Sequence, residues 1–265
     1  MTGVITLQFY QVAASYLFVL ILLAIIRRRK IRRESEILVA SLRMTLQLIL
    51  TGYVLVLVFN NPHPLITLTY LLVMVGFAIH TIFRRFRDQL SPALKRVIFL
   101  AIGSGSLITI FYFLLVVIQV KPWYNPQYFI PIAGMITGNS MTGISLGIKG
   151  LHDGMTREKH LIEEALCLGA SPGQAARRVV NSAFESAILP TIQTMLGMGI
   201  VSLPGMMTGQ ILSGTLPVTA VAYQIAIMMA ITGAVSLSVI ILLQLGYRTF
   251  FNSQVQLIDR PGPAN

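Results

Sequence analysis

Long, uninterrupted apolar runs constrain this chain more than any other feature of its sequence. A helix needs about 20 mostly apolar residues to cross the roughly 30 Å of bilayer hydrocarbon, because each residue adds about 1.5 Å. Six runs meet this requirement. They cover residues 4–26, 37–59, 65–83, 97–120, 128–148 and about 217–246. The sequence therefore predicts an all-α, polytopic membrane protein whose backbone polar groups are satisfied inside helices.

A seventh span is predicted at residues 187–203, although this run is short and contains Pro190. The run that follows it, 204–216, is also apolar and is expected to form a re-entrant segment or an outer half-helix. We therefore expect about seven transmembrane helices in one domain over residues 1–258. The last residues, 259–265, contain two prolines and are expected to be a disordered tail.

The charge distribution predicts the orientation of these spans. Only 11% of the residues are charged while 55% are apolar, which argues against a soluble domain and, despite the net charge of +11, against a nucleic-acid partner. With the N-terminus outside and seven spans, all but two of the 20 lysines and arginines fall in cytoplasmic segments. The exceptions are Lys121 in an outer loop and Arg43 within the second span. Positive charge inside is the usual membrane topology.

The sequence lacks the residues that are characteristic of several classes of activity. All nine acidic residues lie in predicted cytoplasmic segments, whereas proton-coupled carriers usually place a carboxylate inside the membrane. The chain has no GxxxxGK[ST] phosphate-binding loop, so any ATP that drives it must bind a separate subunit. It shows no nucleophile–base pair, and we do not expect an enzyme. Its four histidines and single cysteine have no metal-ligand spacing, so the sequence predicts no particular metal ligands or bound cofactor.

The longest polar segment, residues 149–186, is patterned as two cytoplasmic helices. The first has an apolar face that includes Leu166, and Gly169 follows it as a C-cap. Ser171 and Pro172 are typical of an N-cap and a first helical position. The second helix is sharply amphipathic and leads directly into the span that contains Pro190. A solvated helical hairpin between two spans is the simplest interpretation.

This segment also resembles a known coupling loop. Residues 163–171 read EEALCLGAS and residues 188–190 read ILP, which resembles the "EAA…G…LP" loop of ABC-transporter permeases, with Glu164 at the usual alanine. In those proteins the loop contains the coupling helix that docks into the ATPase subunit. The resemblance implies a coupling role for Glu163, Glu164, Leu166, Leu168, Gly169, Ala170 and Ser171.

Three motifs extend the resemblance over nearly the whole chain. Residues 131–139 (PIAGMITGN), 168–172 (LGASP) and 201–209 (VSLPGMMTG) together look like the FetB family of ABC permeases. That family is associated with iron export in bacteria, and plant relatives are associated with aluminium tolerance. The resemblance implies a multi-pass protein of the bacterial inner membrane that exports iron or another metal ion. It also implies two permease chains, a homodimer, with two ATPase subunits that bind the ATP. A sugar nucleotide or another metabolite is the alternative cargo, because plant relatives are linked to sugar-nucleotide transport.

Two stretches inside the membrane are near-copies of each other. Residues 134–139 read GMITGN and residues 205–210 read GMMTGQ. Their GxxxG spacing, repeated at Gly143 and Gly147, favours close helix packing. Alternatively, the two copies form a paired lining of a transport path in the outer half of the membrane. The residues that would line it are Met135, Asn139, Met206, Met207 and Gln210. Thioethers favour soft metals, whereas Fe(II) is usually held by histidine or carboxylate.

Overall fold

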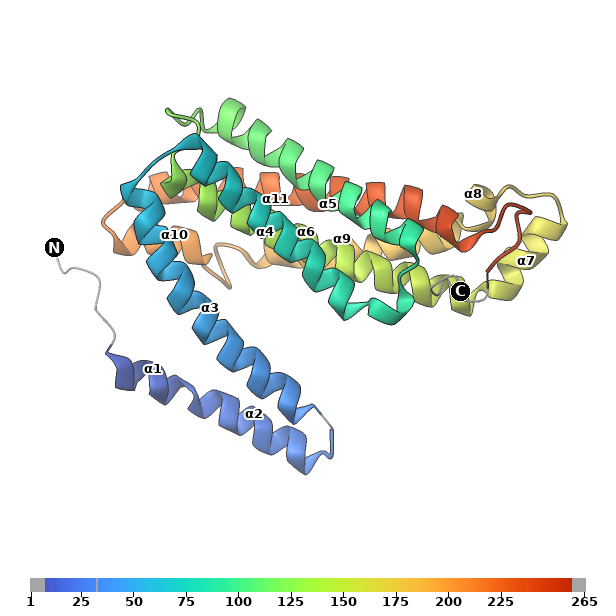
Figure 1. Cartoon of the computed structure of the whole chain (residues 1–265), viewed down its shortest axis with the longest axis horizontal. Coiled ribbons are helices and arrows are strands. Elements are labelled where there is room, and N and C mark those ends of the chain that lie inside the picture. The colour runs from blue at the N-terminus through green and yellow to red at the C-terminus, as the bar shows by residue number, and fades with distance from the viewer. Residues whose placement is uncertain (1–7, 32, 259–265) are drawn as a thin grey trace.

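A computed structural model describes residues 8–31 and 33–258, and within them the chain is helical and has no β-strand (Figure 1). The predicted tail at 259–265 lies outside the described residues. The helices are α1 (Phe9–Ser15), α2 (Leu17–Arg28), α3 (Glu34–Asn60), α4 (Pro64–Arg85), α5 (Pro92–Tyr112), α6 (Pro126–Arg157), α7 (Lys159–Cys167), α8 (Pro172–Ala175), α9 (Arg177–Gly197), α10 (Gly205–Leu212) and α11 (Pro217–Gly246). Short 3₁₀ turns follow α4 and α11, and a π-helical turn, Phe113–Val117, ends α5.

Within the described residues, five stretches are long and apolar enough to cross a membrane. They are Phe9–Arg28, Glu34–Asn60, Pro64–Arg85, Pro92–Val117 and Pro217–Phe250. The prediction of an all-helical, multi-pass membrane protein is confirmed. The helices α6 and α9 have comparable length but carry more polar side chains, and they fall outside this set. The count of seven spans and the outside position of the N-terminus stay predictions.

The body of the molecule is built around α6. This helix packs against α4, α5, α9 and α11, and α11 packs in turn against α5 and α9. Branched side chains fill the space between them, and Ile98, Ile132, Ile144 and Val239 are completely buried. The core is therefore a bundle of long helices, and two of them, α6 and α9, flank the polar segment predicted from the sequence.

Glycines along α6 allow its neighbours to approach closely. A Cβ atom on Gly143 would lie 2.7 Å from Val235 Cγ1 of α11, and one on Gly154 would lie 2.5 Å from Val179 Cγ1 of α9. We call the four positions on this face, Gly143, Gly147, Gly150 and Gly154, the α6 seam. Packing through the Gly143–Gly147 spacing is thus confirmed.

The near-copies do not share this packing. A Cβ atom on Gly138 or Gly209 would meet no atom of the described chain within 4 Å, and one on Gly134 would meet only the Met74 methyl group, at 3.0 Å. Within the described chain, therefore, no neighbouring helix packs closely at Gly138 or Gly209, contrary to the packing expected from the repeated GxxxG spacing.

The helices around the polar segment begin and end at other residues than predicted. Helix α6 does not end near residue 148 but continues to Arg157. Helix α9 begins at Arg177, passes through Pro190 and ends at Gly197, so the run predicted at 187–203 is only its second half followed by a turn. The extra turns persist because Gly154 of α6 packs against Val179 of α9 and Leu151 lies beside Gly246 of α11, and both α6 residues remain buried. The run after this turn contains the short helix α10, as expected for a half-helix.

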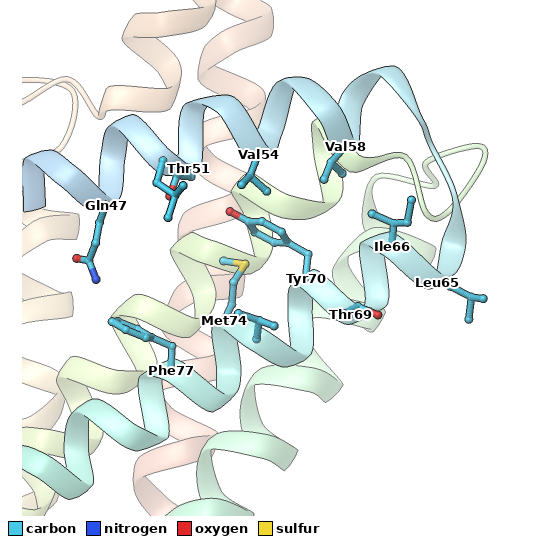
Figure 2. A pocket seen from close by; sticks show the side chains of 12 residues that line it. Gln47, Thr51, Val54, Val58, Leu65, Ile66, Thr69, Tyr70, Met74 and Phe77 are labelled. Atoms are coloured by element: carbon cyan, nitrogen blue, oxygen red, sulfur yellow. The ribbon is translucent and has the colours of Figure 1, made fainter.

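The N-terminal helices diverge from this body. Helices α1, α2 and α3 form an arm that leans away from the bundle, and α3 returns to it near its C-terminal end (Figure 1). The wedge between α3 and α4 encloses a groove of about 810 Å³. Figure 2 shows its mainly apolar lining, with Gln47, Thr51 and Tyr70 among the few polar side chains. The Arg43 guanidinium lies 5.4 Å from the centre of the Phe77 ring in a cation–π contact.

Candidate functional site

A second cavity, of about 200 Å³, lies between α6, α9, α10 and α11, and part of its wall, including Asn139 and Thr194, is exposed. We call it the inner cavity. It occupies the part of the bundle near α10, far from α7 and α8 (Figure 1). Its walls are Met135, Asn139, Thr142, Gly143, Ala187, Pro190, Thr191, Thr194, Met198, Pro204, Gly205, Met206, Gln224, Met228 and Ile231.

The inner cavity brings the two near-copies together. Met135 and Asn139 come from α6, and Met206 comes from the first turn of α10. Two other predicted path residues lie elsewhere: Met207 is 91% buried, outside this lining, and Gln210 is half-buried with its Oε1 atom unpartnered. The structure therefore places three of the five predicted residues on one cavity, and their role in transport stays a prediction.

Sequence reasoning missed most of the remaining polar wall. Gln224 lies on α11, and Thr191 and Thr194 follow Pro190 on α9. The sequence offers a reason to select Gln224, because it is an amide side chain inside an otherwise apolar run. The sequence offers no such reason for Met198 and Met228, because methionine is also an ordinary packing residue.

Three polar side chains of the inner cavity donate hydrogen bonds to backbone carbonyls. Asn139 Nδ2 donates to the Met135 carbonyl oxygen at 2.8 Å, and Thr142 Oγ1 donates to the Gly138 carbonyl at 3.2 Å. Thr194 Oγ1 likewise donates to the Pro190 carbonyl at 2.9 Å.

The Gln224 side chain also donates a hydrogen bond, but its amide oxygen has no partner. Its Nε2 atom lies 3.9 Å from the sulfur of Met198, to which it donates. Its Oε1 atom is buried and has no hydrogen-bond partner, and the whole side chain is only 6% exposed. A buried acceptor without a donor is unfavourable, and such groups are rare in folded proteins. The cavity wall therefore combines methionine, amide and hydroxyl side chains with the first turn of α10, and it includes no charged side chain.

The second candidate site is the helical hairpin formed by α7 and α8. Its turn matches the expectation for Gly169, whose φ angle of 89° favours glycine. The Gly169 N–H bonds to the Leu166 carbonyl and the Ala170 N–H to the Ala165 carbonyl, which closes the end of α7. The predicted cap is also confirmed: Ser171 precedes Pro172, and its N–H donates to Gln174 Oε1 at 2.9 Å.

The hairpin carries one apolar side chain fully into solvent. Leu168 is 89% exposed at the apex, whereas Leu166 is half-buried against the core. Beside the apex, Glu164 is exposed and Glu163 pairs with Lys159 at 3.7 Å. The predicted coupling residues therefore form an exposed apex with an inward-facing Leu166.

The hairpin is joined directly to the walls of the inner cavity. Helix α6 leads into α7 with one residue, Glu158, between them, and α8 leads into α9 through Ala176. Glu158 also bridges the two sides, because its carboxylate lies 3.7 Å from Arg157 and 3.8 Å from Arg178. A displacement of the apex would reach α6 and α9 together.

These features define a polytopic helical membrane protein with an uncharged internal cavity and a helical hairpin tied to the cavity walls. Residues 9–251 match the model of a family described as an uncharacterised protein family, UPF0014, and the chain belongs to that family. The match covers both sites described above.

Similar proteins occur in bacteria and plants. The UPF0014 membrane protein slr1647 of Synechocystis is 37% identical over 89% of this chain and 91% of its own length. The probable iron export permease protein FetB of Escherichia coli is 32% identical over 93% of each chain. The protein ALUMINUM SENSITIVE 3 of Arabidopsis thaliana is 37% identical over 92% of this chain and 88% of its own length. No solved structure matches significantly.

Proposed function

We propose that this chain is the membrane subunit of an ATP-driven exporter of metal ions and that the α7–α8 hairpin docks into a separate ATPase subunit. The observation that carries the proposal is Leu168, an apolar side chain 89% exposed on a capped turn. In water such a side chain gains free energy when a partner covers it. Its neighbours Glu164 and Ser171 supply a polar rim.

The proposed mechanism transmits ATPase closure to the inner cavity. Helices α6 and α9 are the direct continuations of the hairpin, and the α6 seam holds them in close contact. A push on the apex therefore reaches α6 and α9 together, and it is passed on to α11 where Gly143 and Gly147 of the seam pack against that helix. Because ABC ATPases work as closing pairs, the functional assembly contains two ATPase subunits and two copies of this chain.

Two findings support a metal ion as the cargo. The relative FetB is named as a probable iron export permease. In addition, no lysine or arginine is among the lining residues of the inner cavity. A sugar nucleotide carries phosphate groups that arginine or lysine normally binds, so this lining disfavours the alternative cargo.

The docking proposal is tested by Leu168→Gln in the complex with the ABC ATPase subunit from the same organism. A well-packed interface side chain contributes roughly 2 kcal/mol or more, which predicts at least a tenfold loss of ATPase affinity. The matched control is Leu216→Gln, since Leu216 is 73% exposed in the turn between α10 and α11, and α10 lies at the other end of the bundle from α7 and α8 (Figure 1). Affinity is measured by surface-immobilised binding in nanodiscs, and the melting temperature of each variant confirms that it folds.

The outcomes separate clearly. Weak binding by Leu168→Gln with normal binding by Leu216→Gln and unchanged melting temperatures supports docking at the apex. Equal ATPase affinity of Leu168→Gln and the unmodified chain would contradict it. ATP-dependent metal efflux from proteoliposomes that hold the complex tests the export function independently.

A further inference from the structure

Helix α9 stops partway along the bundle instead of running its full length. It ends at Gly197, and a non-helical turn over residues 198–204 leads into the short helix α10 (Figure 1). We call this turn the α9 break. Met198 in the break and Met206 just after it line the inner cavity together with Met135 of α6. The break therefore lies beside the cavity.

Two observations place the α9 break at the depth of the bilayer interior. Met74 lies at the middle of α4, which is one of the candidate membrane spans. A Cβ atom on Gly134 of α6, next to Met135, would lie 3.0 Å from the Met74 methyl group. On α11, the cavity residue Gln224 is seven residues after Pro217, about 10 Å along the helix. Because the hydrocarbon is about 30 Å thick, the break lies within it.

Lipid is a poor neighbour for the α9 break because its backbone is not helical. The N–H groups of Gly199 and Val201 bond to backbone carbonyls, but those of Ile200 and Leu203 donate no hydrogen bond to any described residue. Hydrocarbon offers no acceptor for such groups. Irregular backbone at membrane depth is tolerated only where protein buries it or where it lines a water-filled space.

Water is a poor neighbour for the side chains of the same segment. Ile200 is 93% exposed and Val201 is 85% exposed, and Leu196 in the last turn of α9 is 79% exposed. Apolar side chains grouped in this way gain free energy when they leave water, and such groups mark interaction surfaces. A protein surface can accept both the apolar side chains and the unpaired N–H groups.

A second copy of this chain offers both kinds of contact. Asn139, Gln193 and Ser202 are exposed around the break, and their side-chain oxygens can accept from the N–H groups of Ile200 and Leu203. Two copies with the same orientation in the membrane place residues of equal depth opposite each other across a two-fold axis. None of these residues is charged, so two identical surfaces meet without repulsion.

We infer that the α9 break, with the exposed residues Asn139, Gln193 and Thr194 beside it, is the surface on which a second copy of this chain packs. The inner cavity is open where its wall residues Asn139 and Thr194 are exposed. Each copy thus supplies the missing wall of the other copy's cavity, so the completed site contains residues of both chains. The inference rests on the proposed function for its meaning in transport, but the contact itself requires no ATPase.

The contact is tested by cysteine cross-linking of the full-length chain in liposomes at a low protein-to-lipid ratio, where random encounters are rare. Every protein carries Cys167→Ala, because Cys167 is exposed. The test variant is Ile200→Cys. The matched control is Ile108→Cys, since Ile108 is also exposed, at 60%, but lies on α5, which packs against α6 and α11 and not closely against α9. A short, membrane-permeable bismaleimide should link Ile200→Cys into dimers and leave Ile108→Cys monomeric on a denaturing gel.

A second measurement gives the affinity of the dimer, by single-molecule photobleaching over a range of protein-to-lipid ratios. Ile200→Trp with Val201→Trp keeps the segment apolar but adds bulk to a packed contact. We expect its dimer dissociation constant to rise about tenfold or more, and that of Ile108→Trp to stay unchanged. Melting temperatures verify folding, and cross-linking of Ile200→Cys decides the question if the double variant does not fold.

A chain that remains monomeric at every protein-to-lipid ratio would overturn the inference. So would a dimer in which Ile200→Cys is not cross-linked. Rapid reaction of Ile200→Cys with a membrane-impermeant maleimide would also overturn it, since the break would then face an aqueous path. The export proposal fails in a different way, through absence of ATP-dependent efflux or ATPase binding. A dimer without ATPase docking, and docking without this contact, are therefore distinct results.

Discussion

At the residue scale, the chain separates two uses of glycine that look alike in the sequence. The GxxxG spacing occurs in both near-copies and at Gly143–Gly147, yet only in the latter do both glycines lie against neighbouring side chains. Spacing alone identifies a helix face made of small residues. Whether a neighbour reaches that face depends on which helices are adjacent in space, which the sequence pattern does not specify.

The difference between glycines that lie against a neighbouring helix and glycines that do not can be measured as a difference in the free energy of unfolding. Gly154→Ala introduces a methyl group 2.5 Å from Val179 Cγ1, where the stiff β-branched side chain cannot rotate freely away. We expect a loss of about 1–3 kcal/mol, typical of overpacking, and a lower melting temperature in detergent. Gly138→Ala meets no atom of the described chain and should be neutral or gain up to about 1 kcal/mol of helix propensity. Equal destabilisation by both changes would contradict the α6 seam.

The candidate site was also only partly predictable from single residues. Met135, Asn139 and Met206 could be selected because their two short stretches resemble each other. Gln224 lies on a helix that has no such repeat, and its importance comes from being buried with an unpartnered oxygen. That property depends on three other helices and has no counterpart in local sequence.

At the element scale, local chemistry predicted the hairpin well and the helices beside it poorly. Gly169 ends α7, and Ser171 with Pro172 starts α8, because backbone conformation and capping are decided within a few residues. The extension of α6 to Arg157 was not predicted. Lys149 and Asp153 look like loop residues, and the helix persists because its other face packs against α9.

The hairpin turn gives a second test of local structure. Gly169→Ala places a Cβ atom in a left-handed conformation, at a cost of about 1–2 kcal/mol. Because the turn lies outside the core, we expect amide hydrogen exchange in α7 and α8 to become about 5- to 30-fold faster. The melting temperature of the body should stay the same. Unchanged exchange at the amides of Lys159–Cys167 would show that the turn does not depend on this glycine.

At the scale of the whole molecule, charge and hydropathy determine the arrangement in the bilayer. All-helical structure and several membrane spans follow from the apolar runs, since few other solutions satisfy the backbone in lipid. The arrangement of the helices does not follow in the same way. In lipid, every apolar helix face is acceptable, so the more apolar helix α2 stays exposed while the more polar helix α6 is buried in the bundle.

The orientation is tested by cysteine labelling in intact cells, in a background with Cys167→Ala. Asn61 is exposed between α3 and α4, and Asp153 is exposed near the end of α6. The positive-inside rule predicts that Asn61→Cys reacts with a membrane-impermeant maleimide and Asp153→Cys does not. Cell lysis should make Asp153→Cys reactive and so serves as the control. The opposite pattern in intact cells would invert the topology.

The arm formed by α1, α2 and α3 also bears on how the protein is made. These helices leave the ribosome first, and their large side chains are mostly exposed rather than buried against the body. The arm can therefore enter the membrane as a hairpin before the rest of the chain exists, with lipid as its only neighbour. The bundle around α6 has to wait for α11, since α11 covers α5, α6 and α9 and is among the last segments synthesised. Biosynthesis thus begins with the part that needs no partner and finishes with the helix that closes the core.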